Sequence, residues 1–227
     1  MASYFTPSSL KFLRDLAANN ERDWFQSNKE RYLSLVQEPA LQFIADFAPR
    51  LAKISQHFVS DPRPQGGSLF RIYRDIRFAK DKTPYKTFAA MRFGHESGGD
   101  VHAPGFYLHI EPANSYAGVG LWRPEAASAR NIRQSIVDDP ARWKRAAHSK
   151  AFTSTFTSDG ESLTRPPQGF PADHPLIDDI KRKDFIGGAR LTDRDVTSDE
   201  LLGDFAAMCK TASPFMRYLT EAVGLPY

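Results

Sequence analysis

His109 is the side chain in this sequence best suited to acid–base chemistry. It lies in a stretch where apolar and polar residues alternate, which is typical of a β-strand with one buried face. In that pattern His109 shares a face with Tyr107 and Glu111, and its near-neutral pKa suits proton transfer. Either Glu111 or Asp75 could orient the ring. The candidate catalytic residues are therefore His109, Asp75 and Glu111.

Glycines in the next alternating stretch predict open space above this histidine. A turn over residues 112–115 would join the two stretches into a hairpin, with Gly118 opposite His109 and Gly120 opposite Tyr107. Because glycine has no side chain, a ligand could lie there against the imidazole. In the alternative, a helix covers this face, the histidine is hydrogen-bonded beneath it, and the glycines admit the helix.

Positive charge is concentrated between residues 71 and 92. Seven Lys or Arg residues lie there against two acidic ones, so the segment carries +5, whereas the whole 227-residue chain carries only +3. Cations gathered this closely repel one another unless acidic side chains or an anionic ligand neutralise them. A phosphate or carboxylate group could do so. The candidate ligand-binding residues are Arg71, Tyr73, Arg77, Lys80, Lys82, Tyr85, Lys86, Tyr107 and Trp122.

Arginines within this basic run are expected to play different roles. An extended strand would place Arg71 and Arg77 on one face and Arg74 on the other, among apolar neighbours. A buried guanidinium needs a carboxylate, so we expect Arg74 to form a structural ion pair. In the alternative to a ligand site, internal acids neutralise the run and the remaining cations are solvated. The candidate partners of Arg74 are Asp75, Asp81 and Glu111.

No other pattern predicts a metal site or identifies a cofactor. Cys209 is the only cysteine, which excludes an internal disulfide and a thiolate-rich metal site. The residues His95, Glu96, Asp100 and His102 share a glycine-rich loop, but their spacing is not diagnostic of metal binding. A P-loop and a Gly-x-Ser-x-Gly elbow are both missing from the sequence. We therefore predict no metal site and leave the cofactor unassigned.

The periodicity of the chain predicts an α+β fold, with a central antiparallel sheet of at least four strands flanked by N-terminal and C-terminal helices. Helical spacing covers residues 1–60 and 123–227, and two-residue alternation covers residues 68–122. Connections too short for crossover helices make the sheet antiparallel. No repeat or linker divides the chain, so we expect one domain over 1–227. The expected strands cover residues 69–75, 88–94, 106–111 and 116–122.

Capping signals predict where several helices begin. Thr6 is the expected N-cap of the first helix, with Pro7 at its first position. Near the other end, one helix is expected to begin after Ser198 and a separate one at Pro214.

Composition also predicts a cytoplasmic protein without a membrane segment. No run approaches the roughly 18 apolar residues that a membrane span needs. The first residues lack the basic and apolar regions of a secretory signal, and a single cysteine suits a reducing compartment.

Four sequence blocks resemble a known family. They are FRIYRDIRFAKDKTPYK at 70–86, NERDWF at 20–25, FYLHI at 106–110 and DHP at 173–175. Through them the whole chain resembles the family catalogued as domain of unknown function 2461. The resemblance implies an intracellular protein of mixed α and β structure, and it brings no established activity, cofactor or catalytic residue.

Three functions follow as hypotheses. In the first, a basic and aromatic sheet face binds an anionic ligand, such as a phosphate-bearing small molecule, a nucleotide or a nucleic acid. In the second, the protein is an enzyme that uses His109 as general acid or base on an anionic substrate. In the third, the protein is a scaffold whose charged run is an internal ion-pair network. The oligomeric state stays open.

Overall fold

A five-stranded antiparallel sheet forms the centre of the molecule in our computed structural model, which describes residues 3–97 and 103–227. The strand order is β1-β2-β3-β5-β4. The strands are β1 (Ala89–Gly94), β2 (Gly105–Ile110), β3 (Ser115–Leu121), β4 (Thr157–Asp159) and β5 (Phe185–Leu191). With helices at both ends of the chain, the predicted α+β class and antiparallel sheet are confirmed.

The N-terminal third is helical, as predicted. Its elements are α1 (Pro7–Ala18), α2 (Arg22–Ser27), α3 (Lys29–Tyr32), a π-helical turn η1 (Leu33–Gln37) and α4 (Glu38–Leu51). Helix α1 begins where the capping signal places it: the Thr6 side chain accepts a hydrogen bond from the backbone N–H of Ser9, and Pro7 follows. The last helix of this group, α4, runs through Pro49 without ending there.

Helices also dominate the C-terminal part. They are α5 (Ala126–Asp138), α6 (Pro140–Ala147), α7 (Lys150–Thr155), α8 (Ile177–Ile180), α9 (Asp193–Val196) and α10 (Leu201–Ala222). The prediction of two separate terminal helices is wrong, because α10 continues through Pro214. Phe205, Cys209, Ala212 and Met216 recur at helical spacing and are all buried, so one apolar stripe packs along the whole helix. This packing outweighs the hydrogen bond that proline removes.

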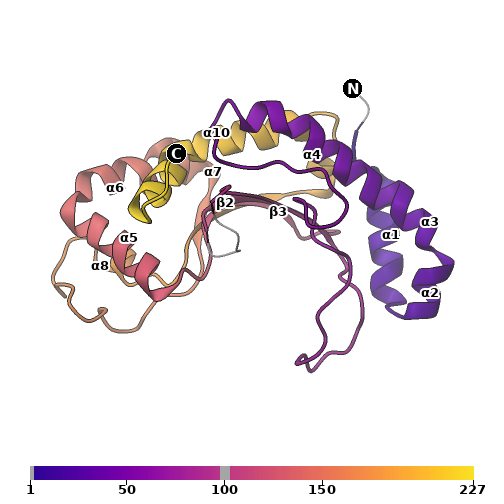
Figure 1. The fold of residues 1–227 in the computed structure, drawn as a ribbon, viewed down its shortest axis with the longest axis horizontal. Coiled ribbons are helices and arrows are strands. Elements are labelled where there is room, and N and C mark those ends of the chain that lie inside the picture. The colour runs from indigo at the N-terminus through magenta and orange to yellow at the C-terminus, as the bar shows by residue number, and fades with distance from the viewer. Residues whose placement is uncertain (1–2, 98–102) are drawn as a thin grey trace.

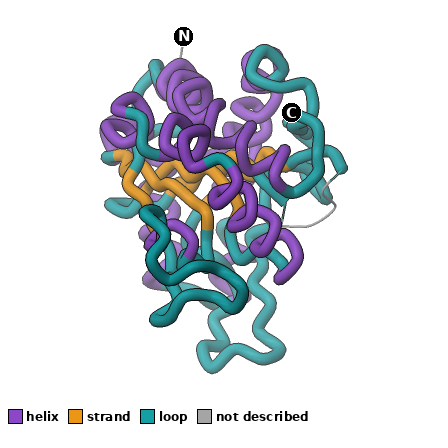
Figure 2. The backbone as a smooth tube through the Cα atoms, turned by 90° about the vertical axis from the view of Figure 1, so that its left-hand side faces the viewer, coloured by secondary structure: helices purple, strands orange, loops and turns teal. Residues whose placement is uncertain are grey.

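Helices α4 and α10 lie across one face of the sheet, whereas none of the described helices lies across the other (Figure 1). On the covered face Phe47 of α4 contacts Phe93 of β1 and Phe205 of α10, with ring centroids 4.7 and 5.0 Å away. Figure 2 shows most helices on one side of the strands and long loops extending from the other. The core therefore lies between the sheet and α4 and α10, and the second sheet face is left for other contacts.

Residues 69–75 do not form the predicted strand, and that prediction is wrong. They make only two isolated bridges, Leu69 with Met91 and Tyr73 with Tyr85. Its start pairs with β1, where the Phe70 N–H donates to the carbonyl of Ala90, and its later residues pair with its own continuation, where the Arg74 N–H donates to the carbonyl of Pro84. We call residues 69–88 the arm; it leaves the sheet at β1, extends beyond it and returns (Figure 1).

The hairpin of β2 and β3 forms, but with a register two residues from the predicted one. His109 lies opposite Tyr116, and Tyr107 lies opposite Gly118. The turn begins at Glu111 rather than Pro112, because the Glu111 backbone N–H donates to the Ser115 hydroxyl and the hydroxyl donates back to the Glu111 carbonyl. A shift of two residues keeps every side chain on its expected face but changes its cross-strand partner.

The sheet is also wider than the predicted span of residues 68–122, because β4 and β5 come from the part predicted to be helical. Strand β5 pairs along the whole of β3 and so occupies a central position. Its alternation of Phe185, Ala189 and Leu191 with less buried residues is clear in the structure. The glycine pair 187–188 interrupts that alternation in the sequence and hides the strand.

Candidate functional site

The sheet face that no described helix covers carries the chemistry-bearing residues; we call it the open face. Side chains directly opposite in antiparallel strands point to the same face, so the register defines two rows. One row runs from His109 through Tyr116 to Arg190, and the next from Arg92 through Tyr107 to Gly118 and Gly188. Rings, guanidinium groups and glycines are therefore neighbours here.

Tyr107 and His109 of β2 form a hydrogen-bonded chain with Glu111, the first residue after the strand. The Tyr107 hydroxyl lies 3.0 Å from Nδ1 of His109, and Nε2 of His109 lies 3.3 Å from Oε2 of Glu111. The same carboxylate accepts from the amide of Asn114 at 2.6 Å and from the Thr87 hydroxyl at 3.4 Å. The alternation of the strand brings these side chains to one face, and the turn after β2 supplies Asn114 to fix the carboxylate.

The partners of His109 determine its tautomer. A carboxylate only accepts hydrogen bonds, so Nε2–H donates to Glu111 and Nδ1 accepts from the Tyr107 hydroxyl. Burial lowers the pKa of His109, although Glu111 opposes this shift, so the imidazole is neutral near pH 7. Burial also raises the pKa of Tyr107, and Tyr116 and Glu111 add to the effect. These hydrogen bonds can thus hold a protonated Tyr107 hydroxyl in one orientation.

His109 is enclosed rather than presented to solvent. His109 is only 5% exposed. Its ring lies between the rings of Phe88 and Tyr116, with centroids 4.3 and 4.7 Å away, and it is nearly parallel to the Tyr116 ring. Both ring nitrogens already have partners. The geometry therefore suits a positioning role for His109 toward Tyr107, and its predicted acid–base role stays a prediction.

The depressed pKa of His109 predicts a pH-dependent stability. In the unfolded chain a histidine takes up a proton below about pH 6.5, whereas the folded state resists protonation, so stability falls as pH drops below that value. We expect a loss of up to about 1.4 kcal/mol per pH unit from this group. Guanidinium denaturation of wild type and His109→Asn at pH 7.5 and 5.0 measures it: the variant should lose less stability. Equal losses in both proteins would contradict the burial argument.

The predicted cations lie mostly on the arm, where some are paired internally. Arg74 contacts Asp81 at 2.5 Å and also the hydroxyl of Thr83, and Arg77 contacts Asp75 at 2.7 Å. Hydrogen bonds from Arg77 hold the pKa of Asp75 at about 2. The backbone N–H of Thr83, together with Arg74, does the same for Asp81. Arg74 thus has one of its three candidate partners, and Asp75 belongs to the arm rather than to the His109 chain.

Other predicted residues divide between the arm and the sheet. Tyr85 is buried against Phe25, with ring centroids 4.1 Å apart, and Tyr73 lies on the same side of the arm. Lys86 donates to the Arg71 carbonyl, and its Nζ lies 5.7 Å from the Phe70 ring centre. Phe70 in turn lies 6.3 Å from Tyr107, so the base of the arm adjoins the open face.

Three predicted residues lie at the margins. Lys82 donates to the carbonyl of Ile76, and Lys80 is exposed near the end of the arm. Trp122 follows β3 and is half-exposed, with the Arg123 guanidinium 4.7 Å from its ring centre. The structure therefore brings Tyr107, His109 and Glu111 together but places these three residues elsewhere.

Sequence reasoning missed Arg190 and the role of Tyr116. Tyr116 stacks on His109, and Arg190 stands opposite Tyr116 on β5 with an exposed side chain. The period-two pattern Phe185, Gly187, Ala189, Leu191 would have placed Arg190 on the polar face of a strand. Its pairing with β3 could not be read from that pattern.

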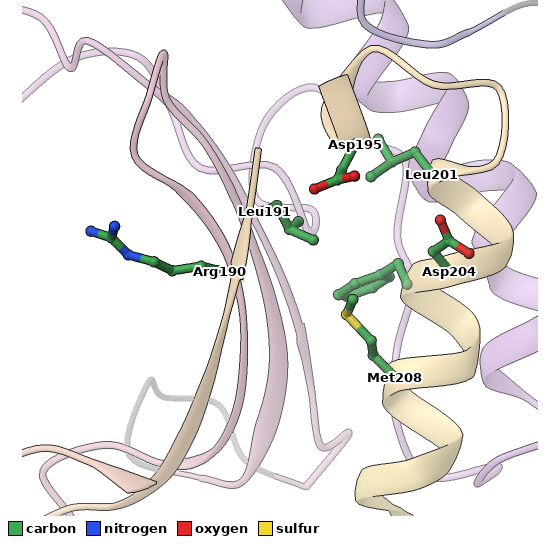
Figure 3. A pocket seen from close by; sticks show the side chains of 7 residues that line it. Arg190, Leu191, Asp195, Leu201, Asp204 and Met208 are labelled. Carbon is green, nitrogen blue, oxygen red and sulfur yellow. The ribbon is translucent and has the colours of Figure 1, made fainter. Parts of the chain in front are cut away.

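Two small hollows lie near the end of β5, away from the predicted residues. One, of about 180 Å³, is lined by Arg190, Leu191, Asp195, Leu201, Asp204, Phe205 and Met208. In Figure 3 the Arg190 guanidinium points away from it, to the other side of β5. The second, of about 340 Å³, is lined by residues 113–115 and 190–193. The candidate site is therefore the surface of the open face rather than either hollow.

The described residues show neither a metal-binding cluster nor a membrane-spanning helix. Within residues 3–97 and 103–227, no group of three or more His, Cys, Asp or Glu side chains is placed to hold a metal ion. In the predicted loop, His95 bonds the Pro226 carbonyl and Glu96 bonds His57, whereas Asp100 and His102 lie outside the described residues. Over the same part of the chain, no helix has both the length and the apolar character needed to cross a membrane.

Comparison with known proteins gives a family without an activity. No curated protein and no solved structure matches the chain. Residues 8–218 match the family described as conserved hypothetical protein (DUF2461), which is nearly the full length. The chain therefore belongs to the DUF2461 family of conserved hypothetical proteins.

Proposed function

We propose that the protein binds a phosphate-bearing ligand on the open face of its sheet. The observation that carries this proposal is Arg190, an exposed arginine beside Tyr116 at the edge of a glycine floor. Among the described residues no carboxylate pairs with it. An exposed guanidinium on the residue directly across from a tyrosine is well suited to bind phosphate with two parallel hydrogen bonds.

The glycine floor supports the proposal by giving a ligand access to the backbone. Gly118 and Gly188 are cross-strand partners on β3 and β5, and both are half-buried. Because neither glycine has a side chain, the backbone is exposed on this face across two strand spacings, about 10 Å. Tyr107 borders this floor on β2, and Arg190 borders it on β5. A flat ligand with a charged end fits such a surface.

Preorganisation of the rings strengthens the same argument. The Tyr107 hydroxyl is held by His109, which is held in turn by Glu111. The Tyr116 ring is stacked on the enclosed imidazole at an interplanar angle of 17°. Rings already fixed in place lose little conformational entropy on binding, so more of the stacking energy contributes to affinity.

The binding hypothesis is better supported than the enzyme hypothesis, which stays a prediction. A general acid or base must reach the substrate with a free nitrogen, whereas both nitrogens of His109 have protein partners. Under the binding hypothesis, the cations of the arm contribute to ligand binding through their electrostatic field. Arg71, Lys80 and Lys82 would attract an anion toward the neighbouring face and raise its association rate.

The test is binding of ATP, as a phosphate-bearing probe, measured by calorimetry at low salt. Replacement of Arg190 with alanine should weaken binding about 10- to 150-fold, because a charge-assisted hydrogen bond contributes about 1.5–3 kcal/mol. Arg194→Ala is the matched control, since Arg194 is also exposed but lies on α9. It should bind as wild type does. Equal affinity of the Arg190→Ala variant and wild type, or no binding by wild type, would refute the proposal.

A further inference from the structure

The tip of the arm presents an almost fully exposed aromatic ring to solvent. Phe78 is 95% exposed, far more than the other large hydrophobic residues at the surface. Because Tyr73 pairs with Tyr85, the two halves of the arm meet near residue 79, so Phe78 lies at the tip. Five residue steps separate Tyr73 from Phe78, so the tip lies up to about 17 Å from that bridge. The ring is thus carried well beyond the sheet.

Contacts between the two halves of the arm hold this tip together. Arg74 on one half pairs with Asp81 on the other, and Nζ of Lys82 donates to the Ile76 carbonyl at 2.9 Å. The guanidinium of Arg77 lies 6.0 Å from the Phe78 ring centre and also pairs with Asp75. An apolar ring displayed by a braced hairpin suggests a partner that covers it.

The charge around Phe78 identifies the chemistry of that partner. Both acidic residues of the arm, Asp75 and Asp81, are already paired with arginines. In the described part of the chain, Arg71, Lys80 and Lys82 have no ion-pair partner, although Arg71 still interacts electrostatically with Asp75. The arm therefore presents surplus positive charge next to an exposed aromatic ring, which favours a partner with negative charge and flat rings.

We propose that the arm binds single-stranded nucleic acid, with a base stacked on Phe78 and neighbouring phosphates on Lys80 and Lys82. This inference rests on the proposed function and deepens it by naming a polymer as the ligand. Base stacking on aromatic side chains and salt-sensitive contacts from cations are the two parts of single-strand recognition. The strand would continue past Phe70 onto Tyr107, whose ring lies 6.3 Å away.

A polymer suits this geometry better than a membrane surface does. Membrane association grows with the apolar area inserted, and the arm offers one fully exposed apolar ring. The aromatic residues instead lie along a path from the tip to the sheet: Phe78, then Phe70, then Tyr107 and Tyr116, with the last two rings 5.7 Å apart. A single nucleotide cannot reach from one end of this path to the other, whereas a strand of several nucleotides can.

The experiment compares the binding of two ligands to the full chain: a fluorescein-labelled oligothymidylate of twelve nucleotides, and ATP. Phe78→Ala should weaken oligonucleotide binding about fivefold or more, since one stacked base is lost. Phe78→Trp should restore it, and ATP binding should not change in either variant. Replacement of both Lys80 and Lys82 with glutamine should lower the slope of log affinity against log salt by about 1.4, two phosphate contacts in a single strand. Unchanged melting temperatures would show that the variants fold.

The outcomes separate this inference from the proposed function. If Phe78→Ala binds the oligonucleotide as tightly as wild type, or if wild type does not bind it, the arm inference is wrong whatever ATP does. If ATP binding fails while the oligonucleotide binds through Phe78, only the proposed site at Arg190 is wrong. If vesicles containing phosphatidylserine bind in a Phe78-dependent way and the oligonucleotide does not, the partner is a membrane and the inference is overturned.

Discussion

Replacement of Phe47 with alanine is expected to lower the free energy of unfolding by about 3–5 kcal/mol. The side chain is fully buried, and its ring contacts Phe93 of β1 and Phe205 of α10 as well as Phe43 of its own helix. Removing it deletes apolar contacts and leaves a cavity where the sheet meets both covering helices. Guanidinium denaturation at pH 7.5 measures the effect.

Phe78→Ala is the matched control for this substitution, because it removes the same ring from a fully solvated position. The side chain is 95% exposed, so its loss should change the free energy of unfolding by no more than about 0.5 kcal/mol. A loss at Phe78 comparable with that at Phe47 would show that the tip of the arm, and not only its base at Tyr85, packs against the body. In that case its exposed ring could not serve a partner.

Gly120→Ala is expected to destabilise the protein by about 3 kcal/mol, the sum of backbone strain of about 1–2 kcal/mol and overpacking of about 1–3 kcal/mol. Gly120 lies in β3 with φ at +118°, a conformation that residues with a side chain rarely adopt. In addition, a Cβ atom there would overlap the carbonyl oxygen of Phe185 on the paired strand β5. Backbone atoms in a central strand cannot move aside cheaply, so the strain would weaken the β3–β5 pairing.

Gly118→Ala, two residues earlier in the same strand, is the control. Its Cβ would lie 3.5 Å from Cβ of Tyr107, an ordinary van der Waals distance. Stability should stay within about 1 kcal/mol of wild type, because alanine also restricts the unfolded chain. Denaturation of both variants measures the two changes in stability. Equal effects would mean that the close approach of β5 is not what excludes a side chain at position 120.

The Gly118→Ala variant should also weaken ATP binding, since the methyl group would stand on the glycine floor.

The sequence by itself determined which side chains share a face. Alternation along β2 placed Tyr107, His109 and Glu111 together, because successive side chains of a strand point to opposite sides whatever the strand pairs with. The helical spacing and the Thr6 cap are local features as well, and they predicted the first helix correctly. These are local consequences of backbone geometry, and the α+β class follows from them.

Only the tertiary structure decided which strands are neighbours. The Ser115 hydroxyl fixed the hairpin two residues away from the expected register, and so gave His109 a tyrosine partner instead of a glycine. Strand β5, which lies far along the chain, pairs with β3 and places Arg190 opposite Tyr116. Of the segment expected as the first strand, only the start pairs with β1, and the rest pairs with its own continuation in the arm. Strand pairing is a competition between distant segments for the same backbone hydrogen bonds. Periodicity within one segment shows its faces, and says nothing about which edge it joins.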